Sequence, residues 1–419
     1  MNDKSISGLT VTLLAFYGLF VVGSTFSIAL AQMAEGIALL LFVVEAIRRR
    51  YNPFGSGLRS FYVAIAVYVG WLLFSSLFSP TPVRSLVSVR EDWLFAAVVI
   101  GIYLMGNKTY RRWLISAFAV SVGVISVYAI IQFFTGFDPM HDYPVYPAGD
   151  FGFRARGNFG GRLTFANYYG TAGIFLLSWG LGGKAILQTR WRRAYIAIGA
   201  LALVATVLSF SRGPIAAMVI SLVIVGIVHG RRMAGVTIVT LLAVGALTWL
   251  TLPGLVDRFG EVRERELSTQ YEGSRLFIWS NSLKVIRDHP VVGVGISNFR
   301  QEYTKHLRPD IGDERKHAHA HNDVLSIAAN NGIPGAVLYV VMWVVVLRLL
   351  WRRARSHPGD ESRFYSRAAL LASIMFLLSS ISEATFADEE VRQMLMFIWA
   401  VGLWPLRHTG ASHTPSEYS

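Results

Sequence analysis

The sequence predicts an all-α polytopic membrane protein with about twelve transmembrane helices. Of its 419 residues, 53% are hydrophobic and only 16% are charged, and the mean hydropathy is +0.45. Soluble domains carry about 25% charged residues. Twelve helices of about 20 residues would use more than half of the chain. A soluble protein of two or three domains is therefore excluded.

Apolar stretches define where the helices are expected. Residues 1–252 should hold nine transmembrane helices, residues 253–335 a loop subdomain, and residues 336–419 three more helices and the C-terminal segment. The stretches are residues 8–25, 27–47, 60–78, 93–105, 113–134, 164–181, 194–209, 213–229, 236–252, 336–350, 366–383 and 393–406.

Basic residues predict the orientation of the helices. One side of the membrane would hold 21 Lys and Arg, and the other 18, of which 11 lie in the long loop 253–335. Long loops cross largely regardless of charge, so the comparison that matters is 21 against 7. Both termini are therefore expected in the cytoplasm, and the long loop outside.

The net charge of +13 has a related interpretation. In a soluble domain it would suggest nucleic acid, but here we assign it to cytoplasmic loops and anionic membrane lipids, with no nucleic-acid partner. The absence of Cys excludes disulfides, thiolate chemistry and Cys-ligated metal centres.

Two outward loops are predicted to be ordered. Residues 135–163 are rich in Gly, Pro, Asp and aromatic residues, which favours a cap without regular helix. In the long loop, Leu276, Trp279, Leu283 and Ile286 recur at helical spacing, and His289-Pro290 should end that helix. A second helix should begin near Asn322 and stop at Gly332.

Lys and Arg are usually concentrated in cytoplasmic loops, so arginines in short outward loops indicate a specific role. Arg212 lies between two apolar stretches with almost no loop, so it sits at the membrane surface, where an ionisable residue indicates a functional site. The alternative is an arginine that reaches to lipid phosphates. The other such residues are Arg84, Arg90, Arg154, Arg156, Arg162 and Arg392.

Arg275 opens the expected helix of the long loop, where a cation opposes the helix dipole. It is either a surface residue, for example paired with Glu272, or part of a site. Two or three arginines that converge outside the membrane would suit a diphosphate, because guanidinium groups bind phosphate oxygens in a bidentate manner.

The segment from His317 to Asp323 holds three of the ten His. Alternate His with Asp323 could bind a metal, but H-x-H occurs by chance and the other outward loops offer no second group of ligands. We interpret His317 and His319 as surface polarity and His321, beside Asn322, as a general base, since a neutral His suits proton abstraction near pH 7. His319 stays open as the alternative base.

Acidic residues in the outward loops are few. No Asp-x-Asp pair is present to clamp a metal-bound nucleotide, and Asp388-Glu389-Glu390 is expected to cap the turn between the last two helices. Arginine alone would therefore have to neutralise a diphosphate. No metal or other cofactor is expected.

These motifs together resemble the O-antigen ligase/polymerase superfamily over residues 145–345. His321-Asn322 with Leu325 and Gly332-Ile333-Pro334-Gly335 is similar to its H-N-x-x-L-x6-G-x-x-G stretch. Residues 288–299 resemble its D-H-P-x-x-G-x-G-x-x-N-F segment, Ser211-Arg212-Gly213 its S-R-G turn, and residues 156–159 its R-x-G-x-F pattern. Where the family often has an acidic residue nine positions after the His, this chain has Asn330; Asp323 could take that role.

The resemblance implies an O-antigen ligase with a GT-C-like fold in the bacterial inner membrane and an active site that faces the periplasm. Such an enzyme is an inverting, metal-independent glycosyltransferase that moves O-antigen from undecaprenyl diphosphate to lipid A–core oligosaccharide during lipopolysaccharide biosynthesis. His321 would be the base, and Arg212 and Arg275 would bind the donor diphosphate. Supporting roles would fall to Arg84, Arg90, Arg156, Arg162, Asn322, Asp323 and His319.

Two other functions stay open. An O-antigen polymerase would use the same donor with a lipid-linked glycan as acceptor, and the late position of the large loop with its His favours the ligase. A lipid-linked glycan transporter would use the arginines to line a path, but such proteins usually show matched repeats, and this sequence shows none.

Overall fold

The structure is a computed structural model and describes residues 8–54, 56–251, 274–308, 317–357 and 360–404. In this part of the chain it is helical, with one isolated β-bridge between Pro147 and Phe153. The α-helices are α1 (Gly8–Gly23), α2 (Ile28–Arg49), α3 (Arg59–Leu77), α4 (Pro82–Val89), α5 (Ala96–Met105), α6 (Lys108–Thr135), α7 (Arg162–Gly182), α8 (Thr189–Leu208), α9 (Arg212–His229), α10 (Arg231–Thr251), α12 (Arg275–Asp288), α13 (Phe299–Lys305), α14 (Asp323–Ala354), α15 (Ser362–Ser380) and α16 (Glu389–Leu403).

Each of the twelve apolar stretches forms a helix, which confirms the all-helical prediction. Six of the described helices (α2, α3, α6, α8, α9 and α14) are long and apolar enough to cross a membrane. Helix α5 has 10 residues and is too short to cross about 30 Å of hydrocarbon on its own. The protein is thus a polytopic membrane protein, and twelve crossings stay a prediction.

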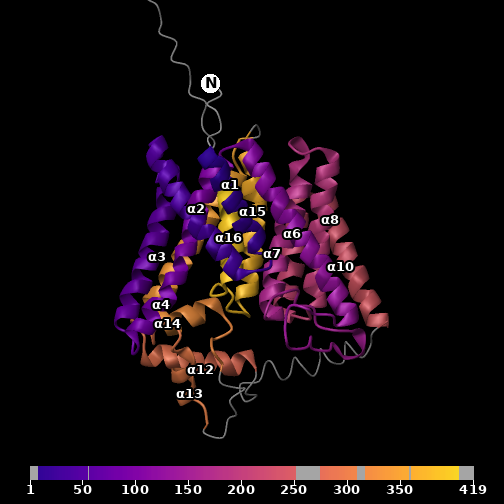
Figure 1. Ribbon diagram of the computed structural model, residues 1–419. Coiled ribbons are helices and arrows are strands. Elements are labelled where there is room, and N and C mark those ends of the chain that lie inside the picture. Colours follow the sequence, from indigo (N-terminus) through magenta and orange to yellow (C-terminus); the bar gives the residue numbers. More distant parts are fainter. Residues whose placement is uncertain (1–7, 55, 252–273, 309–316, 358–359, 405–419) are drawn as a thin grey trace, which may run out of the picture.

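The helices form one bundle, and the described parts of the two loops expected to be ordered outside the membrane share one end of it (Figure 1). Helices α12 and α13 and the segment between α6 and α7 lie at this end, opposite the start of α1. Helices α7 and α16 are buried along most of their length. They reach the loop end from inside the bundle and so bring their first residues to the same place.

Helix α14 is broken where the second loop helix was predicted to stop. Gly332 has φ +75° and ψ 173° inside an otherwise continuous helix. The segment before α13 docks there: the backbone N–H groups of Val294 and Gly295 donate to the carbonyls of Ala329 and Asn330 at 2.9 and 2.8 Å. The glycines of the motif therefore join the loop subdomain to a membrane helix.

Substitution of Gly332 by alanine is expected to destabilise the protein by more than about 1 kcal/mol. Alanine at this position would have to keep the φ of +75°, which residues with a Cβ rarely adopt. Its Cβ would also lie 1.9 Å from the carbonyl oxygen of Val291. Thermal unfolding in detergent should show a lower midpoint. Gly70→Ala is the matched control, because a Cβ at this α3 position has no heavy atom within 4 Å; equal midpoints for both variants would contradict the prediction.

Candidate functional site

The site is built around the carboxylate of Glu383, between α15 and α16. Its Oε1 lies 2.6 Å from Nη2 of Arg275, the first residue of α12, and its Oε2 lies 3.2 Å from Nδ1 of His321. The side chain of Glu383 is 4% exposed. Residues far apart in the sequence, two of them predicted as site residues, thus meet on one buried carboxylate.

The contact with Glu383 fixes the useful nitrogen of His321. A carboxylate accepts hydrogen bonds, so we assign the ring proton to Nδ1, which leaves the lone pair of Nε2 available. The backbone of His321 has φ +49°, a conformation that costs non-glycine residues about 1–3 kcal/mol. This geometry is that of a general base oriented by a carboxylate.

His319 occupies the same place but differs chemically from His321. Its Nδ1 accepts a hydrogen bond from the backbone N–H of His321 at 3.2 Å. Burial, and next the neighbouring His321 ring, lower the pKa of His319 to about 4. A side chain with so low a pKa is a weak base near neutral pH. His321 is therefore the better candidate for the base.

A cavity of about 310 Å³ opens beside the His–Glu pair. The α6–α7 connection, the start of α7, the segment before α14 and the turn before α16 all contribute to it. Its lining residues are Tyr146, Arg154, Arg156, Gly160, Gly161, Arg162, Leu163, Thr164, His319, His321, Glu383, Ala384, Thr385 and Asp388. The cavity therefore combines two histidines, several arginines and two carboxyl groups.

Arginines cluster at this cavity, but those that line it are not the two predicted to bind the diphosphate. Arg162 lines it and donates to the carbonyl of Phe210 at 2.8 Å, and Arg154, Arg212 and Arg275 lie close enough to act on its charge. Arg154 also lines the cavity, although it was not among the residues given a role.

The two residues expected to bind the diphosphate lie next to the cavity. Arg212 is an exposed residue at the start of α9, and Arg275 contacts the cavity-lining Glu383. A Cβ at Gly213 would come within 1.9 Å of Oγ of Ser382, so the S-R-G turn packs against the residue before Glu383. Arg84 is exposed on α4 and does not line the cavity; the side chain of Arg90 lies outside the described part.

The residues after His321 position it. Asn322 caps α14, accepting from the backbone N–H of Leu325 at 2.9 Å, and donates to the carbonyl of Ile381 at 2.9 Å. Asp323 is buried and accepts from the Phe386 backbone N–H and the Tyr339 hydroxyl. The carboxylate that contacts His321 is thus Glu383, and not Asp323, which the sequence suggested for this role.

Asp388 occupies the N-cap position of α16, as the sequence predicts, but its side chain makes no capping hydrogen bond. Its Oδ2 instead accepts a hydrogen bond from Oγ1 of Thr164 in α7 at 2.8 Å, which links the first turn of α7 to the start of α16. Burial raises the pKa of Asp388 to about 7, and nearby Glu390 and Glu383 act in the same direction. Among the described residues, no three His, Cys, Asp or Glu are grouped to hold a metal ion.

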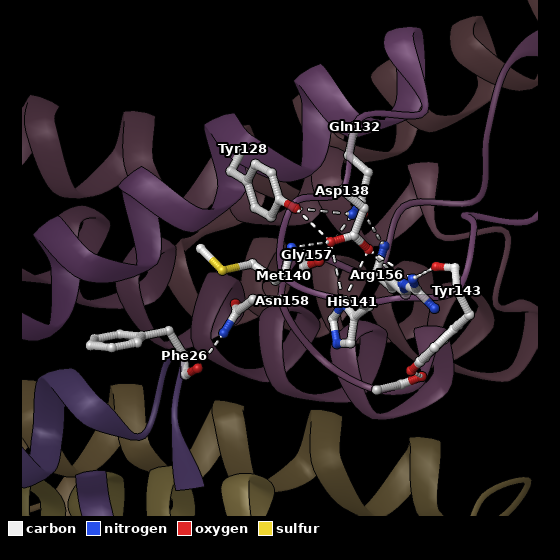
Figure 2. Close-up of polar contacts among 11 residues, drawn as sticks. Phe26, Tyr128, Gln132, Asp138, Met140, His141, Tyr143, Arg156, Gly157 and Asn158 are labelled. Atoms are coloured by element: carbon white, nitrogen blue, oxygen red, sulfur yellow. Dashed lines mark hydrogen bonds and ion pairs between the residues drawn. The ribbon is translucent and has the colours of Figure 1, made fainter. Parts of the chain in front are cut away.

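The α6–α7 connection is an ordered cap, held by the contacts in Figure 2. Nε and Nη2 of Arg156 donate to Oδ2 of Asp138 at 2.9 and 2.8 Å, and Tyr128 donates to its Oδ1 at 3.0 Å. The amide of Gln132 bonds both the Arg156 N–H and the Gly157 carbonyl, at 2.8 and 3.0 Å. Arg156 was expected to support a phosphate; it is paired with a carboxylate and shapes one wall of the cavity.

Removal of one partner of the Arg156–Asp138 pair should destabilise the protein. Their side chains are 5% and 4% exposed, and a fully unpaired buried charge costs about 3–5 kcal/mol. We expect Arg156→Ala alone to lower the unfolding midpoint, by less than that full cost, because Asp138 keeps its contacts with Tyr128 and His141. The double variant Arg156→Ala/Asp138→Asn should lose less than the sum of the single losses; simple additivity would show that the pair does not couple.

Helix α12 begins and ends as predicted, but its buried face differs. Leu283, expected on the buried face, is 55% exposed. The buried positions include Asn281 and Ser282, whose side chains donate to the carbonyls of Phe277 and Ile278 on the same helix. These bonds lower the cost of burial, so polar residues occupy buried positions of α12, which a hydrophobic pattern cannot predict. Glu272, considered as a partner of Arg275, lies outside the described residues.

Fold and site together define a class: a helical membrane protein with a His–Glu pair and a cluster of arginines at one end of its bundle. Residues 197–340 match the family model of the O-antigen ligases, which supports assignment of the chain to that family. The match includes Arg212, Arg275 and His321 and supports a function of the O-antigen ligase/polymerase type in general. No curated protein matches the chain.

Proposed function

We propose that the protein is an O-antigen ligase, an inverting, metal-independent glycosyltransferase with a GT-C-like fold. It would transfer O-antigen from undecaprenyl diphosphate to a hydroxyl of lipid A–core at the periplasmic face of the inner membrane, with both termini in the cytoplasm. The observation that carries this proposal is the His321–Glu383–Arg275 arrangement beside the arginine-lined cavity.

The proposed reaction is a single displacement. The acceptor hydroxyl gives its proton to Nε2 of His321 as its oxygen attacks the anomeric carbon. The new C–O bond forms as the bond from that carbon to the diphosphate oxygen breaks, and the leaving group keeps the electron pair. Glu383 stabilises the imidazolium ion that results. Attack from the face opposite the leaving group inverts the configuration.

The arginines supply the other half of the chemistry. Negative charge on the diphosphate rises as the bond breaks, and fixed cations that face this charge stabilise the transition state. Arg154 and Arg162 line the cavity, and Arg212 and Arg275 lie around Arg162. We propose that this cluster binds the diphosphate; Arg275 also holds Glu383 and so links both halves of the site.

Deletion of the gene in its host tests the proposal against the alternatives. Lipopolysaccharide on a silver-stained gel should show lipid A–core without a ladder, and wild type but not His321→Ala should restore it. Core with one repeat unit would indicate a polymerase. An unchanged ladder would argue against both functions, and glycan transfer by purified protein in detergent would exclude a transporter.

A further inference from the structure

Several side chains of the cavity have no task in this mechanism. Among them are Tyr146 in the cap, Thr164 in the first turn of α7 and Asp388 before α16. The cavity volume of about 310 Å³ is at the small end for ligand pockets. It suits a short glycan end and not a whole polysaccharide, so a residue that lines it meets the sugars closest to the reacting atoms.

The side chain of Asp388 can accept more hydrogen bonds than the one it makes in the described part of the chain. A carboxylate offers about four acceptor positions, and among the described residues the Asp388 side chain accepts from Thr164 alone. Thr164 donates its hydroxyl proton to Oδ2, which leaves Oδ1 of Asp388 and the lone pairs of Thr164 for a ligand. Two neighbouring acceptors of this kind match the adjacent hydroxyl donors along the edge of a sugar ring.

Tyr146 offers the complementary apolar surface. It is 67% exposed although it is aromatic and lines the cavity. Its backbone is fixed, because its carbonyl accepts from the N–H of Arg154 at 2.8 Å and the neighbouring Pro147 forms the β-bridge with Phe153. A ring on a fixed backbone loses little conformational freedom when a ligand covers it, and the C–H face of a sugar is a suitable cover.

We propose that Tyr146, Thr164 and Asp388 form a sugar-binding subsite of the cavity, with the ring face against Tyr146 and hydroxyl groups on Asp388 and Thr164. This inference rests on the proposed function, since it assigns the sugar next to the transferred bond. The sugar belongs either to the donor glycan or to the core acceptor, and both present the same chemistry.

Direct binding to purified protein in detergent tests the subsite without turnover. The parent is His321→Ala, into which Tyr146→Ala, Thr164→Val or Asp388→Asn is added. The ligands are undecaprenyl diphosphate, the same lipid bearing one O-antigen repeat, and lipid A–core. Tyr146→Phe keeps the ring, and Phe137→Ala removes a cap aromatic that is 60% exposed and does not line the cavity.

We expect Tyr146→Ala to weaken binding of one sugar-bearing ligand about 2- to 10-fold and Asp388→Asn to weaken it about 10-fold. The bare lipid diphosphate, Tyr146→Phe and Phe137→Ala should show no change. A loss for the glycan-bearing lipid assigns the donor sugar, and a loss for lipid A–core assigns the acceptor. Unchanged binding of both, or an equal loss for the bare lipid, would overturn the subsite. A parent that binds no glycan ligand would count against the proposed function instead.

Discussion

His321→Ala is expected to reduce glycan transfer about 10²- to 10⁴-fold, the usual contribution of a general base. Nδ1 of His321 is held by Glu383, so Nε2 is the nitrogen that can take the proton from the acceptor hydroxyl. The initial rate of transfer by purified protein, at saturating donor and acceptor, is the measurement. Because alanine removes only the ring, the binding of undecaprenyl diphosphate should be preserved.

His319→Ala is the matched control for this experiment. His319 also lines the cavity, and its ring centroid lies 4.3 Å from that of His321. Its pKa of about 4 makes it a weak base, so its removal should cost far less activity. If His319→Ala were inactive and His321→Ala active, the roles of the two side chains would be reversed.

Glu383→Gln is expected to lower kcat about 10²- to 10⁴-fold with a smaller effect on KM. Glutamine preserves the shape of the side chain but loses the charge that pairs with Arg275 and stabilises the protonated His321 ring. Glu383 acts through His321, which makes it a positioning residue. Initial rates over a range of acceptor concentrations separate the two kinetic constants.

Glu383→Asp and Glu302→Gln complete this test. Aspartate restores the charge at a longer distance, so it should recover part of kcat. Glu302 in α13 pairs with Lys305 and does not line the cavity, so Glu302→Gln should leave transfer unchanged. A rise in KM at constant kcat in Glu383→Gln would mean that Glu383 contacts substrate and does not orient the base.

Local patterns predicted the helices well because local forces form them. Runs of apolar residues marked twelve of the described helices, and Asn322 and His289-Pro290 marked helix ends. The short helices α4 and α13 were not predicted, because neither contains a long apolar run.

The prediction failed where a side chain has a distant partner: the side chain of Asp388, expected to cap a turn, accepts instead from Thr164 in α7. The second loop helix breaks at Gly332 as predicted, and the segment from Val291 to Gly295 docks at the break.

The candidate site shows the same division. His321 and Arg275 stand out in the sequence. His321 lies in a segment that holds three of the ten His, and Arg275 is a cation in the first turn of a helix. Glu383 does not stand out, since it lies in a short turn after an apolar helix, 62 residues from His321 and 108 from Arg275. A single acidic residue in such a turn carries no local sign of a partner.

The sequence by itself determined most of the helices and singled out His321, Arg212 and Arg275 as candidate site residues. Hydrophobic burial and helix capping act over a few residues, so their traces can be seen in the amino-acid order. Only the tertiary structure decided which charges pair: Glu383 with His321 and Arg275, and Asp138 with Arg156. These contacts depend on how the helices pack at one end of the bundle, and the energy of a buried charge is set by the neighbours that packing brings to it.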